Sequence, residues 1–368
     1  MRNKIISILF CLLLAAGVAS HLLTADKYYS ESEKRTLAQF PAISWESIRS
    51  GKFGDDIENY LADQFPSRNG WVTIKTVAER LSGKKESGGV YFAEDGYLIE
   101  IHKTFPVKQT VANIGAVKQL QDAIATRGIT LRLMLAPTAG NILSEKLPVY
   151  APNADQQEII EYAKKQCLNV VDVTDVLNEH NVEYLFYKTD HHWTSLGAYY
   201  AYAAWIEAKG EVIDPITAWT KEQLCDNFRG TTYAKVNYPF APFDVIDAYY
   251  KTEAHKVDYN SGNYVTDSIY ERKYLNGSDQ YAAFFNSNQA TTVVSGEGAG
   301  KLLILKDSYA NCFAQFCIDD YEETHMIDMR FFRGSVQKYI EENGVTEVLV
   351  LYNVPNFTSD TGITRCAK

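Results

Sequence analysis

The chain has 368 residues, of which 46% are apolar and 22% are charged, a balance that is ordinary for a folded protein and excludes a largely disordered one. This length is enough for one large domain or two ordinary ones. The net charge of −10 offers no basic surface for phosphate backbones, so we expect no nucleic-acid partner.

Residues 1–25 have the pattern of a targeting segment. Arg2 and Lys4 precede an apolar run that continues to Ala19. Cleavage after Ala19 would release a secreted protein, whereas a run continued through Leu23 is roughly long enough for an uncleaved anchor. The pattern therefore predicts a signal peptide or membrane anchor and an extracytoplasmic protein. If it is anchored, it lies at the outer face of the cytoplasmic membrane and contacts the membrane only through this segment.

Residues 26–100 are expected to form a helical segment and then a hairpin over 88–100, because Asp95-Gly96 is a strong turn signal between alternating runs. From 101 to 210, helical and β-like stretches alternate. The expected helices are 108–127, 154–167, 174–180 and 195–210, and the expected strands are 129–137, 168–173 and 182–187. This alternation predicts an α/β domain with a parallel sheet and flanking helices.

Residues 211–298 interrupt the alternation with short, tyrosine-rich runs such as 231–236 and 245–250, and are expected to form an inserted β-rich lobe. Tyrosine rings suit sugars, although aromatic packing explains them equally well. The second part of the α/β domain follows over 299–368. It has expected strands at 301–306, 325–332 and 346–353 and helices at 308–318 and 334–343.

Ser308 stands where the buried run KLLILK passes through Asp307 directly into a helix. In open parallel sheets, chemistry gathers at the C-terminal ends of strands. A serine at such a turn gains backbone N–H donors and the positive end of a helix dipole. Its hydroxyl is a weak nucleophile and needs a base, which in turn needs an orienting partner.

Asp190 and His192, in TDHHW, provide such a base and partner. This stretch also lies between an expected strand and an expected helix, so we expect it at the same sheet edge as Ser308. On extended backbone, a spacing of two points Asp190 and His192 to one face and turns His191 away.

Two other interpretations of TDHHW are a polar helix entry capped by Asp190 and a metal site made from its histidines and carboxylate. Adjacent histidines usually diverge, and no further ligand motif or CxxC spacing is present. The co-occurrence of Ser308 favours the catalytic interpretation, with no metal and no cofactor expected.

TDHHWTSLGAYYAY and ILKDSYANCF together resemble the DHHW protein family, which is akin to the alginate O-acetyltransferase proteins. The resemblance implies an SGNH-hydrolase-like fold with permuted motif order, in which the aspartate and histidine precede the serine. It also implies that Ser308 is the nucleophile, His192 the general base and Asp190 its orienter. For the oxyanion or substrate it implies Asn353, while Arg330 stands at the strand end where a glycine would be expected.

We therefore expect an exported O-acetyltransferase or acetylesterase that acts on a cell-envelope or extracellular polysaccharide. Its partners would be a polysaccharide acceptor and an acetyl donor. The resemblance favours transfer, with acetyl groups passed outward by a membrane-bound O-acyltransferase. The alternative is a non-catalytic carbohydrate-binding or scaffold protein of the cell envelope, a role that the tyrosine-rich segment would suit.

Overall fold

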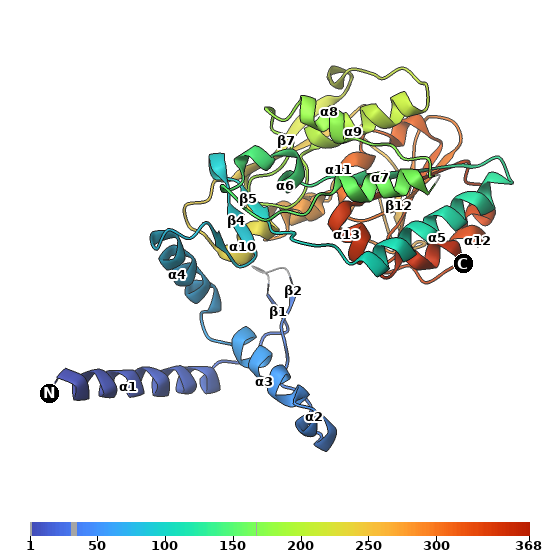
Figure 1. Ribbon diagram of the computed structural model, residues 1–368. Helices are drawn as coiled ribbons and strands as arrows, with labels where there is room; N and C mark the ends of the chain where they lie inside the picture. Colours follow the sequence, from blue (N-terminus) through green and yellow to red (C-terminus); the bar gives the residue numbers. More distant parts are fainter. Residues whose placement is uncertain (1, 31–34, 167) are drawn as a thin grey trace. The chain divides into compact units, whose positions relative to one another are not determined.

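The computed structural model describes residues 2–30, 35–166 and 168–368, which form two compact units (Figure 1). One unit contains the chain up to Gly88 together with Ala234–Phe240, and the other contains Gly89–Tyr233 and Ala241–Lys368. Cys167, where the expected helix 154–167 ends, lies outside the described residues.

The N-terminal unit is mainly helical. Its elements before Gly88 are α1 (Arg2–Leu23), β1 (Tyr29–Ser30), β2 (Arg35–Thr36), α2 (Trp45–Arg49), α3 (Lys52–Asp63), α4 (Arg68–Leu81) and β3 (Glu86–Ser87). Within α1, the segment Lys4–Leu23 is long and apolar enough to cross a membrane, a property that a signal sequence near the N-terminus shares.

A seven-stranded sheet forms the centre of the second unit, in the order β10-β9-β11-β13-β12-β14-β6. Four neighbouring strands are parallel: β13 (Glu323–Ile327), β12 (Lys301–Lys306), β14 (Glu347–Asn353) and β6 (Thr130–Ala136). Three more continue the sheet in antiparallel pairing: β11 (Thr291–Ser295), β9 (Val257–Tyr259) and β10 (Tyr264–Thr266). The sheet is therefore mixed. Its parallel half contains the strands expected over 129–137, 301–306 and 346–353, whereas the strand expected over 325–332 ends at Ile327.

Helices cover both faces of this sheet because its buried strands alternate between two apolar clusters. Leu302 and Ile304 of β12 belong to one cluster, and Leu303 and Leu305 belong to the other. The first cluster includes α6 (Ala139–Ile142), α8 (Thr174–Glu179), α9 (Ser195–Ala208) and α11 (Tyr309–Ala314). The second includes α5 (Val107–Ala125), α7 (Gln157–Lys165), α12 (Val336–Asn343) and α13 (Val354–Ser359), of which α5, α12 and α13 lie together in Figure 1.

The hairpin expected over 88–100 is present. Strands β4 (Val90–Phe92) and β5 (Leu98–Glu100) pair antiparallel, and Asp95 and Gly96 in the turn both have left-handed backbone angles.

Two expected strands do not form. Residues 168–173 make a single parallel bridge, from Val170 to Leu133 of β6, and residues 182–187 make a single antiparallel bridge, from Phe186 to Trp193. Pairing beside β6 ends where the chain turns into α8, and at this turn the Asp172 carboxylate accepts a hydrogen bond from the amide of Thr174 (3.0 Å). Short apolar runs of this kind predict burial more reliably than they predict a ladder.

The segment 211–298 contains strands as expected, but three of them (β9, β10 and β11) extend the central sheet. Only β7 (Thr220–Phe228) and β8 (Asp244–Tyr250) form a separate two-stranded sheet. Residues 231–236, expected as a β-like run, form the helix α10 (Thr231–Val236). Its first amide donates to the carboxylate of Asp190 (2.7 Å), a tertiary contact that overrides the β preference of two consecutive threonines.

Candidate active site

Ser308 lies at the carboxyl end of β12, immediately before α11, where the sequence placed it. Asp307 holds this turn. Its Oδ1 accepts the amide of Tyr309 (2.9 Å), and its Oδ2 accepts the amide of Asn353 (3.0 Å) and Nδ2 of Asn356 (2.9 Å). Burial raises the pKa of Asp307, and these hydrogen bonds oppose the shift. These hydrogen bonds connect the carboxyl ends of β12 and β14 next to Ser308.

The TDHHW segment reaches the same place by a different route. Residues 188–192 are bends rather than extended backbone, and the bridge from Phe186 to Trp193 closes them into a loop. Oδ1 of Asp190 accepts the backbone amide of His192 (3.0 Å), which makes an Asx turn, and it also binds Nδ1 of the same histidine. Asp190 contacts His192 as expected. The expected reason is wrong, because the two side chains meet through an Asx turn and not through the alternation of an extended strand.

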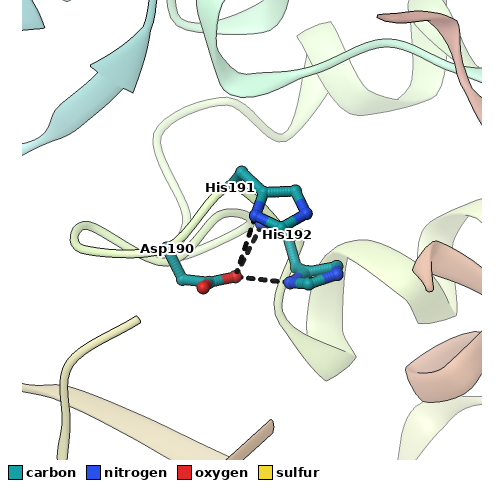
Figure 2. Close-up of side chains that lie close together, drawn as sticks. All are labelled: Asp190, His191 and His192. Atoms are coloured by element: carbon teal, nitrogen blue, oxygen red, sulfur yellow. Dashed lines mark hydrogen bonds and ion pairs between the residues drawn. The ribbon is translucent and has the colours of Figure 1, made fainter. Parts of the chain in front are cut away.

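His191 does not turn away as expected. Its Nδ1 lies 3.8 Å from Oδ1 of Asp190 and 2.5 Å from Oγ1 of Thr231, and its ring centroid is 3.9 Å from that of His192. Figure 2 shows both imidazoles beside one oxygen of Asp190. The Asx turn brings consecutive side chains to one side of the loop, which a strand would not do.

His192 and Ser308, from the two remote segments, are joined by a hydrogen bond. Nε2 of His192 lies 2.7 Å from Oγ of Ser308, although 116 residues separate the two. Exposed fractions of 2% for Asp190, 4% for His192 and 8% for Ser308 leave the group nearly enclosed. The structure therefore brings together the three residues that the sequence assigned to one site.

Two further contacts fix the loop against α11. The indole Nε1 of Trp193 donates to the carbonyl of Tyr309 (2.9 Å), and the Tyr309 hydroxyl donates to the carbonyl of His191 (2.5 Å). Trp193 is fully buried, so it serves packing.

Thr231 and Gly230, which the sequence analysis did not predict to be part of the site, contact the other side of the Asp190 carboxylate. Oδ2 accepts the amide (2.7 Å) and the hydroxyl (3.0 Å) of Thr231. A Cβ atom added to Gly230 would lie 2.1 Å from Oδ2 of Asp190, so the carboxylate requires glycine there. The stretch FRGTTYAK contains both residues, but no local pattern indicates contact with a loop some 40 positions earlier in the chain.

Asp244 of β8 supports the start of the same loop. It accepts the amides of Lys188 and Thr189 (2.8 Å each), the hydroxyl of Thr189 (2.5 Å) and the hydroxyl of Tyr184. Burial raises the pKa of Asp244, against the effect of these donors. A buried carboxylate with four donors is an ordered anchor rather than a reactive group.

Asn353 and Arg330 have different structural roles. Asn353 ends β14, and its side-chain oxygen accepts the amide of Asn356 (2.8 Å) as the N-cap of α13. Arg330 follows β13, and within the described part of the chain its hydrogen bonds all go to the buried Asp328. Neither side chain is hydrogen-bonded to Ser308 among the described residues.

A pocket of about 60 Å³ borders the loop and the end of β14. Its lining is mixed, with apolar residues such as Leu98 and Ile99 beside the polar residues Glu100, His102, Thr138, Asp190, His191, Asn353 and Asn356. This volume is enough for a few water molecules or a small acyl group.

The carboxylate and imidazoles of Asp190, His191 and His192 also lie within 4.8 Å of one another, a spacing that could hold a metal ion. However, Oδ1 of Asp190 and Nδ1 of His192 bind each other, and Nδ1 of His191 is bound by Thr231. An ion would have to replace these contacts and would still lack a fourth protein ligand from the cluster.

Comparison with known proteins identifies the family. A family model described as DHHW protein matches residues 105–327, and the chain belongs to this family. A DHHW family protein from Eubacterium siraeum is similar in structure, with a TM-score of 0.66, 24% identity, and coverage of 76% of this chain and 95% of that one. No curated protein matches the sequence.

Bacillus cereus PatB1, solved with a sulfonyl adduct, has a TM-score of 0.63 and 18% identity, over 76% of this chain and all of that one (100%). The O-acetyltransferase domain of Pseudomonas putida AlgJ is more distant, with a TM-score of 0.49, 13% identity, and coverage of 74% of this chain and 93% of that one. The chain thus shares the α/β fold of the DHHW family protein and of PatB1.

Proposed function

We propose that the chain is an exported serine-dependent O-acetyltransferase or acetylesterase acting on a cell-envelope or extracellular polysaccharide. The observation that carries the proposal is the 2.7 Å contact between Nε2 of His192 and Oγ of Ser308, with Asp190 on the opposite ring nitrogen. A nucleophile, a base and an orienting carboxylate in this order are what acyl transfer by serine requires.

In the proposed reaction, His192 removes the proton from Ser308 while Oγ attacks the carbonyl carbon of an acetyl ester. Asp190 holds the imidazole with Nε2 toward the serine and stabilises the imidazolium that forms. The tetrahedral oxyanion would be bound by the Ser308 amide, which lies at the strand-to-helix turn. The imidazolium then protonates the leaving alcohol, and an acetyl-serine remains.

Asn353 is the proposed second oxyanion donor. Its side-chain oxygen accepts a hydrogen bond from the amide of Asn356, and Asn353 lines the same pocket as Asp190. An amide donor fixed by a helix cap is preorganised, and donors of that kind contribute most to oxyanion stabilisation. Arg330 remains a weaker candidate because Asp328 occupies its guanidinium.

The second half of the reaction decides between the two activities. A sugar hydroxyl that attacks acetyl-serine gives transfer, and water gives hydrolysis, with His192 as the base in both. The resemblance to alginate O-acetyltransferase proteins supports transfer, with acetyl groups delivered by a membrane-bound O-acyltransferase. The apolar helix α1 supports export, either as a cleaved signal or as an anchor.

The test uses a sulfonyl fluoride, because PatB1 has been solved with a sulfonyl adduct. The purified chain in detergent is treated with phenylmethylsulfonyl fluoride, and modified peptides are identified by mass spectrometry. We expect one modified residue, Ser308, and loss of p-nitrophenyl acetate hydrolysis in proportion to labelling. Wild-type protein that releases nitrophenol no faster than Ser308→Ala would support the non-catalytic binding protein instead.

Two additions to this assay separate the remaining alternatives. Oligosaccharide acceptors are supplied with an acetyl donor, and acetylated sugars, rather than free acetate alone, would identify a transferase. Activity is also measured after EDTA treatment, and we expect no change. A loss that zinc restores would point to a metal bound by Asp190, His191 and His192.

A further inference from the structure

Tyr281 contacts both members of the pair formed by His192 and Ser308. Its ring is stacked on the imidazole of His192, with the centroids 3.8 Å apart and the planes 11° from parallel. Its hydroxyl donates to the backbone carbonyl of Ser308 (3.0 Å). Tyr281 comes from η5 (Gln280–Ala283), far in sequence from either partner, and it is 5% exposed.

The second face of the same imidazole is covered by His191, whose ring centroid is 3.9 Å from that of His192. Two rings at these distances cannot occupy one face, so His192 lies between them. Rotation of the imidazole away from Ser308 would therefore collide with one neighbour or the other. The ring remains in the orientation that its bonds to Asp190 and Ser308 define.

The backbone that carries Tyr281 is itself held in an unusual conformation. Phe285, Asn286 and Ser287 are three consecutive non-glycine residues with left-handed φ values of 52°, 54° and 66°. L-residues disfavour this region, and such runs persist only where surrounding contacts enforce them. Some of these contacts lie within the segment, where the Ser287 amide donates to the carbonyl of Ala282 (3.0 Å), and others come from side chains next to the serine turn.

Lys306 of β12 contacts the residue that follows this run. Its buried ammonium donates to Oδ1 of Asn288 (2.9 Å) and to Oδ1 of Asn311 (2.6 Å). Nδ2 of Asn311 in turn lies 3.5 Å from the carbonyl of Ser287. The segment 281–288 is thus tied to the strand and the helix on either side of Ser308.

From these contacts we infer that Tyr281 is a positioning residue for the proposed reaction, holding the His192 ring in line with the Ser308 hydroxyl and stabilising the imidazolium through its π face. This inference rests on the proposed function. A cation over an aromatic face is attracted by the ring quadrupole, and the attraction grows when water is excluded. Burial raises the pKa of Tyr281, so its hydroxyl remains a neutral donor to the serine carbonyl.

The experiment compares Tyr281→Leu, Tyr281→Met and Tyr281→Phe with wild type in p-nitrophenyl acetate hydrolysis across pH. Leucine and methionine keep the face apolar and remove the π system, and the flexible methionine side chain adapts best to the space that is left. For both we expect kcat to fall about 10- to 100-fold, KM to change by less than about 3-fold, and the acidic midpoint of the profile to fall by about half a pH unit. Phenylalanine keeps the stack, so its midpoint should not move.

Among the described residues, the groups next to the imidazole include Asp190, Ser308, His191, Tyr281 and Tyr309, whose ring centroid is 5.5 Å away. None except Tyr281 changes in these variants, so a moved midpoint is attributable to the lost ring.

Tyr259→Leu is the matched control. Tyr259 lies on β9 of the central sheet and is 1% exposed. Its ring is stacked on that of Tyr264, with the centroids 5.7 Å apart and the planes 11° from parallel. It should lose stability without a change in the pH midpoint. Folded Tyr281→Leu or Tyr281→Met protein with the wild-type kcat and midpoint, or with changes no larger than those of the control, would overturn the inference.

Titration of His192 by NMR separates this inference from the proposed function, because it does not require turnover. The resonance is assigned by its absence in His192→Gln. Wild-type protein that is inactive, but whose His192 pKa falls in Tyr281→Leu, would refute the enzyme while leaving the stacking effect intact. An active wild type whose His192 titration is unchanged by Tyr281→Leu would refute the positioning role alone.

Discussion

The two halves of the candidate active site are positioned in different ways. Ser308 takes its place from regular structure, because β12 pairs in parallel with β13 and β14 and passes directly into α11. Asp190 and His192 lie in a loop of bends, and side chains fix their positions. The carboxylate of Asp244, the amide and hydroxyl of Thr231 and the missing side chain of Gly230 determine that loop.

This difference predicts how well each half of the site tolerates amino-acid substitution. A strand in the middle of a sheet is stabilised by many equivalent hydrogen bonds, so the loss of one shifts its end little. A loop fixed by a few side chains depends on each of them, and buried groups left without partners are costly. We therefore expect substitutions around Asp190 to reduce activity more than comparable substitutions around the β12 turn.

The largest effect should come from Asp190→Asn. The amide has nearly the same shape, but it cannot accept from the His192 amide and ring on one side and from Thr231 on the other. We expect kcat for p-nitrophenyl acetate to fall about 10³-fold or more at pH 7, because the imidazole loses its orienting charge. An Asp190→Asn protein whose kcat is within about 10-fold of wild type would show that the loop is not the sensitive half.

Gly230→Ala should cost about 10²-fold in kcat, because a displacement of the orienting group by about 1 Å is enough for such a loss. The added methyl group would lie 2.1–2.4 Å from Oδ2, Cβ and Cγ of Asp190, which must move. Gly115→Ala is the matched control. Gly115 is in α5 with nothing within 4 Å of the added methyl group, and alanine there should stabilise the protein by up to about 1 kcal/mol without altering kcat. Equal activities of the two variants would contradict the importance of this close approach.

Asp244→Asn tests the support of the loop through stability. The carboxylate accepts from Lys188, from Thr189 twice and from Tyr184, and an amide leaves some of these buried donors without an acceptor. We expect the free energy of unfolding to fall by about 2 kcal/mol, measured by urea denaturation, together with a loss of activity. Unchanged stability would mean that the loop is held elsewhere.

The smallest effect concerns the serine side and its dependence on pH. Burial lowers the pKa of Lys306 from 10.5 to about 8, so between these values the unfolded chain binds more protons than the folded protein. The free-energy cost of burying the charged Lys306 side chain therefore decreases as pH increases from about 8 to 10.5, and the free energy of unfolding rises by the same amount. Relative to Lys306→Met, wild type should gain about 1 kcal/mol in unfolding free energy between pH 7 and pH 9. Parallel stability curves for the two proteins would contradict this pKa.

Much of the molecule follows from local patterns in the sequence. The run KLLILK followed by Asp307 and Ser308 predicts a buried strand ending in a serine, and β12 and α11 have this form. The turn signal at Asp95-Gly96 likewise predicts the hairpin that is found. These features depend on side-chain alternation and turn chemistry within about ten residues, which a single sequence displays directly.

Tertiary structure alone decided how Asp190 meets His192 and what surrounds them. The Asx turn is present in place of the expected extended backbone. The hydrogen bonds that a neighbouring strand would have made are instead made between backbone amides and the carboxylates of Asp244 and Asp190, and Thr231, distant in sequence, donates one of these amides. Tyr281 also reaches His192 by a long-range contact, from the segment 211–298 that contributes three strands to the sheet. Contacts between residues many positions apart depend on the packing of whole elements, and no local period or motif encodes that packing.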